Sequence, residues 1–209
     1  MCGLIVFDVD GTLFDTKKGI ISALNYVLNQ FGEEDIPVNE QDKYIGPSIR
    51  ESLMKYNGFS VEKSEEATGL YREVYVERFI SQSVPYSHLD EVLIELQGMG
   101  FELGIATMKT KRQVERLLEI FRLTDVFKFV KTAREDGALS KKQMLIDICD
   151  LFEANQLDVY MVGDTQGDYE AARAAGCRFI AADYGYGRIT EESSEVKHIN
   201  TLYEVLNVL

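Results

Sequence analysis

Five short runs of apolar residues stand out along the chain, at positions 4–7, 103–106, 127–130, 159–162 and 179–182. None of them alternates regularly between apolar and polar residues, as a strand with one face in water would. Runs of this length and kind are typical of strands that are covered on both faces. The pattern therefore predicts several parallel strands.

Between these runs, apolar residues recur three and four positions apart, which is the spacing of an amphipathic helix. The clearest stripes lie within segments 89–96, 114–121 and 144–152. Strand, helix and strand in alternation predict an α/β fold with a doubly wound parallel sheet. In such a sheet, ligands bind at the carboxyl ends of the strands.

The alternation has one large gap after the first strand. Roughly seventy residues pass before a helix and a strand follow again, and this interval contains helical stripes within 20–31, 49–54 and 67–79. An insertion of that size is expected to form a small all-α domain. We therefore predict an α/β core from residues 1–15 and 84–209, and a helical cap from residues 16–83 that could act as a lid.

The composition predicts an ordered protein and argues against one class of partner. Of the 209 residues, 45% are hydrophobic and 27% are charged, which is typical of a globular chain. The 35 acidic and 22 basic residues give a formal net charge of -13, so a nucleic acid would meet a repulsive surface. A phosphorylated small molecule would need local positive charge from lysines, backbone amides or a metal ion.

The sequence shows no sign of export or of a membrane partner. It has no basic and then apolar signal segment, and no apolar run reaches the roughly 18 residues that span a bilayer. Cys2, Cys149 and Cys177 lie far apart in the sequence and lack the spacing of a zinc or redox site. We expect free thiols and a cytoplasmic location.

The segment "IVFDVDGTLFDT", residues 5–16, places two aspartates at the end of the first predicted strand. Asp8 and Asp10 are two positions apart, so in extended backbone both side chains lie on the same side of the chain. Two carboxylates this close repel each other unless a cation compensates or one is protonated. An Asx-type turn would also fit, but the continuous apolar run before the motif favours a functional site.

This segment resembles the first motif of the haloacid dehalogenase superfamily of phosphohydrolases, and later motifs of that family follow in order. The resemblance implies a Rossmann-like core. It implies that Asp8 is a nucleophile forming an aspartyl phosphate, and that Asp10 protonates the leaving oxygen and then activates water. It also implies Mg²⁺, held by the Asp8 carboxylate and the Asp10 carbonyl. Asp15 matches none of these roles, and we expect it at a helix N-terminus or a hinge.

Thr107, in "LGIATMKT", resembles the residue of the second motif that donates a hydrogen bond to the phosphoryl group. On its own, a threonine at a strand end is more often structural. Relatives usually place a small polar residue after this threonine, often followed by Lys-Pro, whereas this chain has Met108, Lys109 and Thr110. The departure predicts a more apolar pocket wall.

The third motif requires a lysine that neutralises the nucleophile and the phosphate, and "DGALSKKQMLID" offers two. A lysine at the start of a helix suits an anion site, because the helix dipole acts in the same direction. Lys142 fits best, lying just before the apolar stripe that begins at Met144. Lys141 is the alternative, since adjacent helical residues point in different directions.

The segment "VYMVGDTQGDYEAA" resembles the fourth motif, in which a metal is bound after another apolar strand. The resemblance implies that Asp164 is a direct metal ligand and that Asp168 is a second ligand or an outer partner. If a helix begins near Thr165, Asp168 lies about one turn into it. Helix capping would be the ordinary role for an isolated pair of this kind.

The remaining resemblance points to the phosphoglycolate phosphatase-like branch of the superfamily. "YIGPSIRESL" resembles a segment of that branch's helical cap, which makes Lys43 and Arg50 candidates for contacting the leaving group. Exposed helix charges are more often simply solvated. Neither the substrate nor the oligomeric state can be read from the sequence.

The predicted function is that of a Mg²⁺-dependent phosphatase acting on a small phosphorylated metabolite. A phosphomutase of the same family would keep all four motifs and return the phosphoryl group to the substrate. A non-catalytic regulator that binds a phosphorylated metabolite is the alternative from a different class. A carbon-halogen hydrolase is disfavoured, because that branch lacks the acid that Asp10 supplies and needs no metal.

Overall fold

The computed structural model describes residues 3–134, 139–152, 158–190 and 193–209. The chain divides into two compact units, Met1–Asp15 with Pro85–Leu209, and Thr16–Val84. The larger unit contains the main sheet, and the smaller unit is helical. The role of the smaller unit as a cap stays a prediction.

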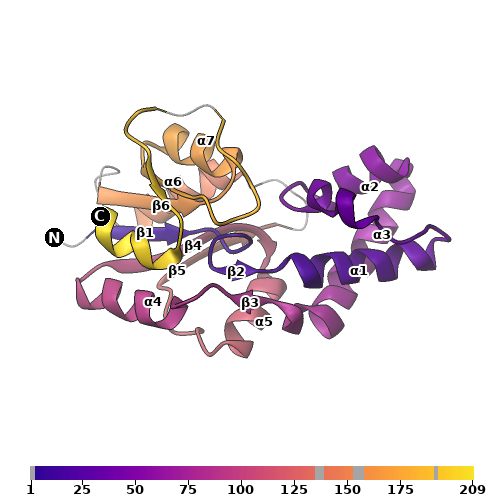
Figure 1. The fold of residues 1–209 in the computed structure, drawn as a ribbon, viewed down its shortest axis with the longest axis horizontal. Helices are drawn as coiled ribbons and strands as arrows, with labels where there is room; N and C mark the ends of the chain where they lie inside the picture. Colours follow the sequence, from indigo (N-terminus) through magenta and orange to yellow (C-terminus); the bar gives the residue numbers. More distant parts are fainter. Residues whose placement is uncertain (1–2, 135–138, 153–157, 191–192) are drawn as a thin grey trace. The chain divides into compact units, whose positions relative to one another are not determined.

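A six-stranded sheet forms the centre of the larger unit, in the order β5-β4-β1-β6-β7-β8 (Figure 1). Every pair of neighbouring strands is parallel. The strands are β1 (Leu4–Phe7), β4 (Glu102–Thr110), β5 (Phe129–Ala133), β6 (Val159–Gly163), β7 (Arg178–Ala182) and β8 (Lys197–Ile199). All four residues of β1 are buried, as its uninterrupted apolar run predicts.

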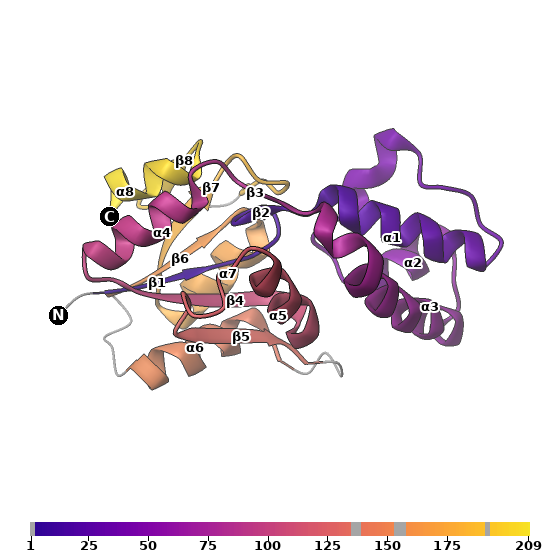
Figure 2. The same ribbon diagram turned by 90° about the horizontal axis from the view of Figure 1, so that it is seen from below.

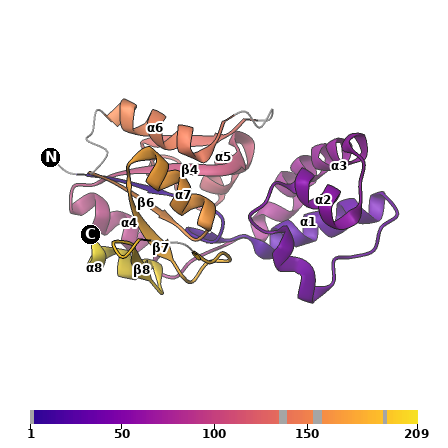
Figure 3. The ribbon, with the colours of Figure 1, turned by 90° about the horizontal axis from the view of Figure 1, so that it is seen from above.

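Helices cover both faces of this sheet. One face carries α6 (Lys141–Phe152) and α7 (Gln166–Ala175), with α7 lying over β6 (Figure 3). The other face carries α4 (Leu89–Gly98) and α5 (Lys111–Ile120), seen in front of the sheet in Figure 2. Leu4 and Val6, alternate residues of β1, share a core with the apolar side of α6. The doubly wound α/β fold predicted from the sequence is confirmed.

Some elements of the larger unit differ from the sequence-based expectation. β4 continues to Thr110, beyond the predicted run 103–106, and β5 begins at Phe129 rather than at 127. The sequence does not predict β8, because this strand has three residues of which two are exposed. The shorter elements are β2 (Phe14–Asp15) paired with β3 (Val84–Pro85), and η5 (Leu202–Glu204) before α8 (Val205–Val208).

The smaller unit consists of α1 (Lys17–Gln30), η1 (Val38–Tyr44), α2 (Ile49–Asn57), α3 (Val61–Val74), η2 (Tyr75–Phe79) and η3 (Ile80–Gln82). Serine side chains start two of these helices, because Ser48 accepts from Glu51 N–H and Ser60 from Lys63 N–H. The third predicted stripe, 67–79, is not one regular helix, since α3 widens into the π-helix η2. None of the described helices is both long and apolar enough to cross a membrane.

The register of the main sheet sets the position of the candidate site. Phe7, the last residue of β1, pairs with Ile105 of β4 and with Val162 of β6. Asp8 extends this ladder by donating its N–H to the Val162 carbonyl at 3.0 Å. The residues that follow β1 therefore lie level with the carboxyl ends of β4 and β6, where doubly wound folds bind their ligands.

Candidate active site

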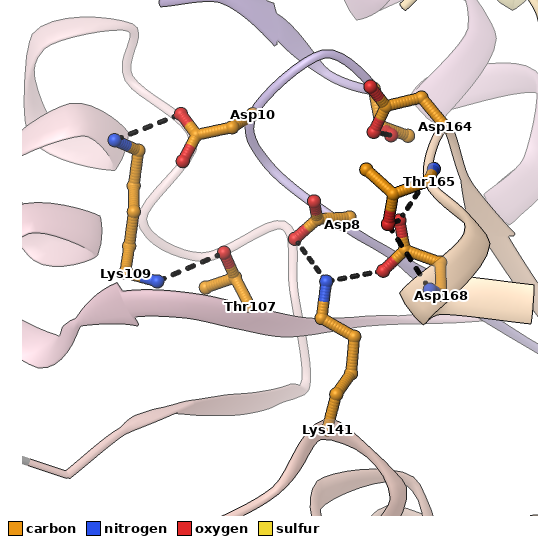
Figure 4. Close-up of polar contacts among 9 residues, drawn as sticks. Asp8, Asp10, Thr107, Lys109, Lys141, Asp164, Thr165 and Asp168 are labelled. Carbon is orange, nitrogen blue, oxygen red and sulfur yellow. Dashed lines mark hydrogen bonds and ion pairs between the residues drawn. The ribbon is translucent and has the colours of Figure 1, made fainter. Parts of the chain in front are cut away.

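Polar side chains converge at the carboxyl edge of the sheet (Figure 4). Asp8 follows β1, Thr107 lies near the end of β4 and Asp164 follows β6. Their exposed fractions are only 6%, 1% and 2%. Lys141 and Asp168 join them from the first turns of α6 and α7. The structure therefore brings together residues that stand far apart in the sequence.

The lysine of this site is Lys141, which corrects the preference for Lys142. The Lys141 ammonium nitrogen lies 3.0 Å from Asp8 Oδ1 and also pairs with Asp168 Oδ1 (Figure 4). Its side chain is 12% exposed, whereas Lys142 is an exposed residue. The proposed role in phosphate binding therefore passes to Lys141.

The start of α6 explains this correction. Ser140 caps the helix, because its hydroxyl oxygen accepts from Gln143 N–H at 3.2 Å, so Lys141 is the first helical residue. Lys141 precedes the buried Met144 and Leu145 by three and four positions. Residues at that spacing share one helix face, and the Lys141 side chain is consequently directed to the sheet.

Asp168 is held in place by the residues around it. One carboxylate oxygen, Oδ1, pairs with Lys141. The other, Oδ2, accepts from the Thr165 N–H at 3.0 Å and from the Thr165 hydroxyl at 2.7 Å. The Thr165 hydroxyl oxygen in turn accepts from Asp168 N–H, which completes a capping box at the start of α7. Asp168 thus combines both roles considered from the sequence, helix capping and contact with the site.

Asp164 is fixed by a loop that follows β7. Its Oδ2 accepts from Tyr186 N–H at 2.8 Å and from Gly187 N–H at 3.1 Å. Its Oδ1 lies 3.4 Å from the hydroxyl of Thr12. Two backbone amides therefore neutralise one side of the carboxylate. Nothing in the spacing of "DYGYGR" indicates this function, which only the fold makes visible.

Burial disfavours the charged form of the two central carboxyl groups. It raises the pKa of Asp8 to about 7; the Lys141 ammonium opposes this rise, and nearby carboxylates add to it. Burial likewise raises the pKa of Asp164 to about 6. For Lys141, burial acts to lower the pKa, but Asp168 and Asp8 outweigh it and raise the pKa above its usual range. Lys141 is therefore an ammonium at neutral pH.

Three of these carboxylates can hold a divalent metal ion. Asp8, Asp164 and Asp168 each offer an oxygen, and these oxygens lie within 4.8 Å of one another. Asp8 Oδ1 is buried and lies 3.0 Å from the Lys141 ammonium. One ammonium against three buried carboxylates leaves negative charge uncompensated. The donor set thus fits a hard cation such as Mg²⁺, whose ligands are oxygens.

The carboxylate of Asp10 does not belong to this group of three. It pairs with Lys109, for which the sequence motifs predict no role. Lys109 Nζ lies 2.9 Å from Asp10 Oδ1 (Figure 4). The Lys109 side chain is only 4% exposed, which is unusual for lysine. The sequence does contain a signal. Lys109 stands two positions after Thr107, as Asp10 stands two after Asp8.

The remaining residues singled out from the sequence make contacts of their own. Within the smaller unit, Lys43 pairs with Glu40 at 3.1 Å and Arg50 with Glu65 at 3.2 Å. Asp15 accepts from the Tyr186 hydroxyl at 2.6 Å, and the residue that caps α1 is Thr16. Asp15 therefore lies directly before the N-terminus of α1, and its role as a hinge stays a prediction.

Two cysteines that are distant in the sequence are neighbours in the structure. The sulfur atoms of Cys149 and Cys177 lie 3.7 Å apart and both residues are buried. They are free thiols, as expected. Cys2 lies outside the described residues.

The raised pKa values predict a stability that depends on pH and on metal. In the unfolded chain Asp8 and Asp164 lose their protons near pH 3.8, whereas in the folded protein they do so near 7 and 6. Their stabilising contribution is complete below pH 3.8 and is lost as the pH rises through 6 and 7. We expect the melting temperature in EDTA to fall between pH 5 and pH 8. Thermal unfolding measured across that range would show this.

Magnesium should reverse that loss, because it binds the ionised carboxylates. At pH 8 we expect saturating Mg²⁺ to raise the melting temperature clearly, and to do so much less at pH 5. Sodium chloride at matched ionic strength is the control. A metal-free protein that grows more stable as the pH rises would contradict the burial of ionisable carboxylates.

Gly185 lies in the loop after β7 that holds Asp164, at a position with no room for a side chain. A Cβ at this position would lie 2.5 Å from the Gly11 carbonyl oxygen and 2.6 Å from Asp164 Oδ2. We expect Gly185→Ala to destabilise the protein by about 2 kcal/mol and to weaken Mg²⁺ binding, because the loop amides must move. Gly167→Ala is the matched control, since its Cβ would meet only Thr165 Oγ1 at 3.7 Å. Thermal unfolding and Mg²⁺ titration separate the two variants, and equal behaviour would contradict this reading of the loop.

Comparison with known proteins agrees with this architecture. Residues 5–182 match the model of the haloacid dehalogenase-like hydrolase family. The tyrosine-protein kinase PtkA of Mycobacterium tuberculosis is 30% identical over 214 residues, which cover 99% of this chain and 72% of that protein. A phosphoglycolate phosphatase of Nitrosospira multiformis is 29% identical over 98% of this chain and 94% of its own. A crystal structure described as a predicted phosphatase of Clostridium acetobutylicum superposes with a TM-score of 0.88 at 26% identity, covering 99% of this chain and 98% of that one.

Proposed function

The chain belongs to the haloacid dehalogenase-like hydrolases and is an enzyme of their phosphatase type; we propose that it hydrolyses small phosphomonoesters through an aspartyl phosphate, with Mg²⁺ as cofactor. The environment of the Asp8 carboxylate supports this proposal most directly. This buried carboxylate follows the central strand, lies 3.0 Å from the Lys141 ammonium and shares a cluster with Asp164 and Asp168. The same arrangement suits a nucleophile that must meet an anionic substrate.

The first half of the proposed reaction transfers the phosphoryl group to the protein. An Asp8 carboxylate oxygen attacks phosphorus, and the bond from phosphorus to the ester oxygen breaks. Asp10, which begins this step as the carboxylic acid, gives its proton to that departing oxygen, so that an alcohol leaves. Lys141 compensates charge on Asp8 and on the phosphoryl oxygens. The Thr107 hydroxyl oxygen accepts from Lys109 N–H at 3.3 Å. The hydroxyl hydrogen of Thr107 then points away from Lys109 N–H, and in this proposal it is donated to the phosphoryl group.

The second half returns the protein to its starting state. Asp10, now a carboxylate, takes a proton from water, and the resulting hydroxide attacks phosphorus. The bond between phosphorus and the Asp8 oxygen breaks, inorganic phosphate is released and Asp8 is again a carboxylate. Splitting a slow hydrolysis into two displacements lowers each barrier.

The proposed Mg²⁺ would be held by the carboxylates of Asp8 and Asp164 and by the Asp10 carbonyl, with Asp168 as a further ligand or an outer partner. Bound there, it supplies positive charge that offsets the repulsion between the carboxylate nucleophile and the dianionic substrate. The amides of Tyr186 and Gly187 orient Asp164 for this purpose. Asp168, already bonded to Lys141 and Thr165, fixes both of these neighbours.

The direct test measures inorganic phosphate released from phosphomonoesters, with Mg²⁺ and with EDTA. Release that requires Mg²⁺ is expected. Acid quenching during turnover followed by borohydride reduction should convert the aspartyl phosphate to homoserine, and peptide mass spectrometry should locate it at position 8. Turnover without any modification of Asp8 would contradict the covalent intermediate.

The substrate is proposed only as a class, a small phosphorylated metabolite. A screen should include phosphoglycolate, the substrate named for the Nitrosospira relative, together with sugar phosphates, nucleoside monophosphates and pyrophosphate. An isomerised product without net phosphate release would indicate the phosphomutase alternative. Binding without turnover would indicate the regulatory alternative. Contacts of Lys43 and Arg50 with the leaving group, and a cytoplasmic location, stay predictions.

A further inference from the structure

Lys109 is a buried lysine at the edge of the site, two positions after Thr107, and the proposed reaction gives its side chain no role. Its side chain is 4% exposed and its ammonium lies 2.9 Å from Asp10 Oδ1. Burying an ammonium costs free energy unless an opposite charge compensates it. β4 continues past the predicted strand end, so that Lys109 lies beside Asp10. This pairing with Asp10 compensates the buried charge.

Each of the two lysines of the site pairs with a different one of the two aspartates that follow β1, Asp8 and Asp10 (Figure 4). Lys141 pairs with Asp8 and Asp168, and Lys109 pairs with Asp10. They arrive from different elements, α6 and β4. Lys109 therefore acts at the residue proposed to transfer the proton, and Lys141 at the proposed nucleophile.

Lys109 also touches Thr107, through its main chain. The Lys109 N–H donates to Thr107 Oγ1 at 3.3 Å, while the Lys109 ammonium reaches Asp10. One residue thus orients a phosphate-binding hydroxyl and a proton-transferring carboxylate at once. Such a double contact couples the placement of the phosphoryl group to the placement of the acid.

From this geometry we infer that Lys109 is a positioning residue for Asp10. By holding Oδ1, it directs Oδ2 toward the oxygen of the leaving group. This inference rests on the proposed phosphatase function. Lys109 acts through Asp10 and not on the phosphoryl group. Its effect on the rate therefore depends on how much the leaving group needs a proton.

The test compares two substrates in wild type and in Lys109→Met. p-Nitrophenyl phosphate releases a stabilised anion that needs little protonation, whereas glycerol phosphate releases an alkoxide that needs a full proton. We expect kcat/KM to fall about 30-fold for glycerol phosphate and at most about 3-fold for p-nitrophenyl phosphate. The ratio kcat/KM is used because it reports departure of the leaving group and not hydrolysis of the phosphoenzyme.

A double-mutant cycle with Asp10→Asn gives the second readout. In that background, Lys109→Met should change kcat/KM for glycerol phosphate by less than about 2-fold, since the residue through which it acts is already altered. Lys109→Arg keeps the positive charge and should restore most of the activity toward glycerol phosphate. If Lys109→Met does not fold, Lys109→Gln and Lys109→Arg provide the same comparison.

Two outcomes would overturn the inference. Equal losses for both substrates would show that Lys109 acts on the phosphoryl group or on the fold. Losses that add fully to those of Asp10→Asn would show that it does not act through Asp10. Both are distinct from failure of the proposed function, in which wild type itself would release no phosphate from either ester.

Discussion

Asp8→Asn is expected to abolish phosphate release while leaving the fold intact or more stable. An amide cannot attack phosphorus as a carboxylate does, so we expect kcat/KM to fall by on the order of 10³-fold or more, as when other covalent enzymes lose their nucleophile. Phosphate release with saturating Mg²⁺ measures this loss. The borohydride experiment should then find no homoserine at position 8.

The stability of this variant separates a catalytic effect from a folding defect. Burial raises the pKa of Asp8 to about 7 even with Lys141 beside it, so at pH 8 the metal-free fold carries a carboxylate that it disfavours. A neutral amide of the same shape removes this cost, and the free energy of unfolding in EDTA should rise by on the order of 1 kcal/mol. An inactive protein that is also more stable cannot owe its inactivity to misfolding.

Asp125→Asn is the matched control for this substitution. Asp125 is exposed, between α5 and β5, at the amino ends of the strands. The same change there should alter activity by less than about 2-fold and stability by less than about 0.5 kcal/mol. Wild-type activity in Asp8→Asn would remove Asp8 as the nucleophile and with it the covalent intermediate.

The core of the fold was predictable from the sequence because its signals are local. An uninterrupted apolar run predicts a strand that is covered on both faces, and β1 and β6 match their predicted starts. Helical stripes predict α4, α5 and α6 in the same way. The failures lie where tertiary contacts replace local pattern. β8 is three residues long and pairs with β7, while η2 widens the end of α3.

The candidate site likewise combines residues that a local pattern predicts with residues that only tertiary contacts reveal. Asp8 and Asp164 could be found because each follows a buried strand directly, and a parallel sheet brings such positions to one edge. The Asp164 loop could not be found, since its contribution comes from backbone amides of Tyr186 and Gly187, which carry no side-chain signature. The pattern does not indicate Lys109, because the apolar run ends at residue 106 whereas β4 continues to Thr110.

The helical phase of α6 distinguishes Lys141 from Lys142 in the sequence itself. Lys141 lies three, four and seven positions before Met144, Leu145 and Ile148, all of which are buried. That spacing places it on the centre of the apolar face of the helix. Lys142 is closer in the sequence to the apolar stripe that begins at Met144, but Lys141 has the helical phase of that stripe. The helical phase decides which lysine side chain points to the sheet.

Lys141→Met is expected to damage both activity and stability, which distinguishes it from Asp8→Asn. The ammonium that lies 3.0 Å from Asp8 is lost, and with it the compensation of charge on the phosphoryl group. We expect kcat/KM to fall by on the order of 10²- to 10³-fold, as when a preorganised electrostatic donor is removed. Asp8 and Asp168 also lose their shared partner, so the metal-free protein should be less stable by about 3 kcal/mol at pH 8.

Lys142→Met provides a control of the same composition one residue away. Lys142 is exposed, so this variant should stay within about 2-fold of wild type in activity and about 0.5 kcal/mol in stability. Saturating Mg²⁺ should recover much of the stability of Lys141→Met, because a divalent cation offsets the same carboxylates, but not its activity, because the ammonium also serves the phosphoryl group. Comparable activity losses in the two lysine variants, or full recovery of Lys141→Met by Mg²⁺, would contradict a contact between Lys141 and the substrate.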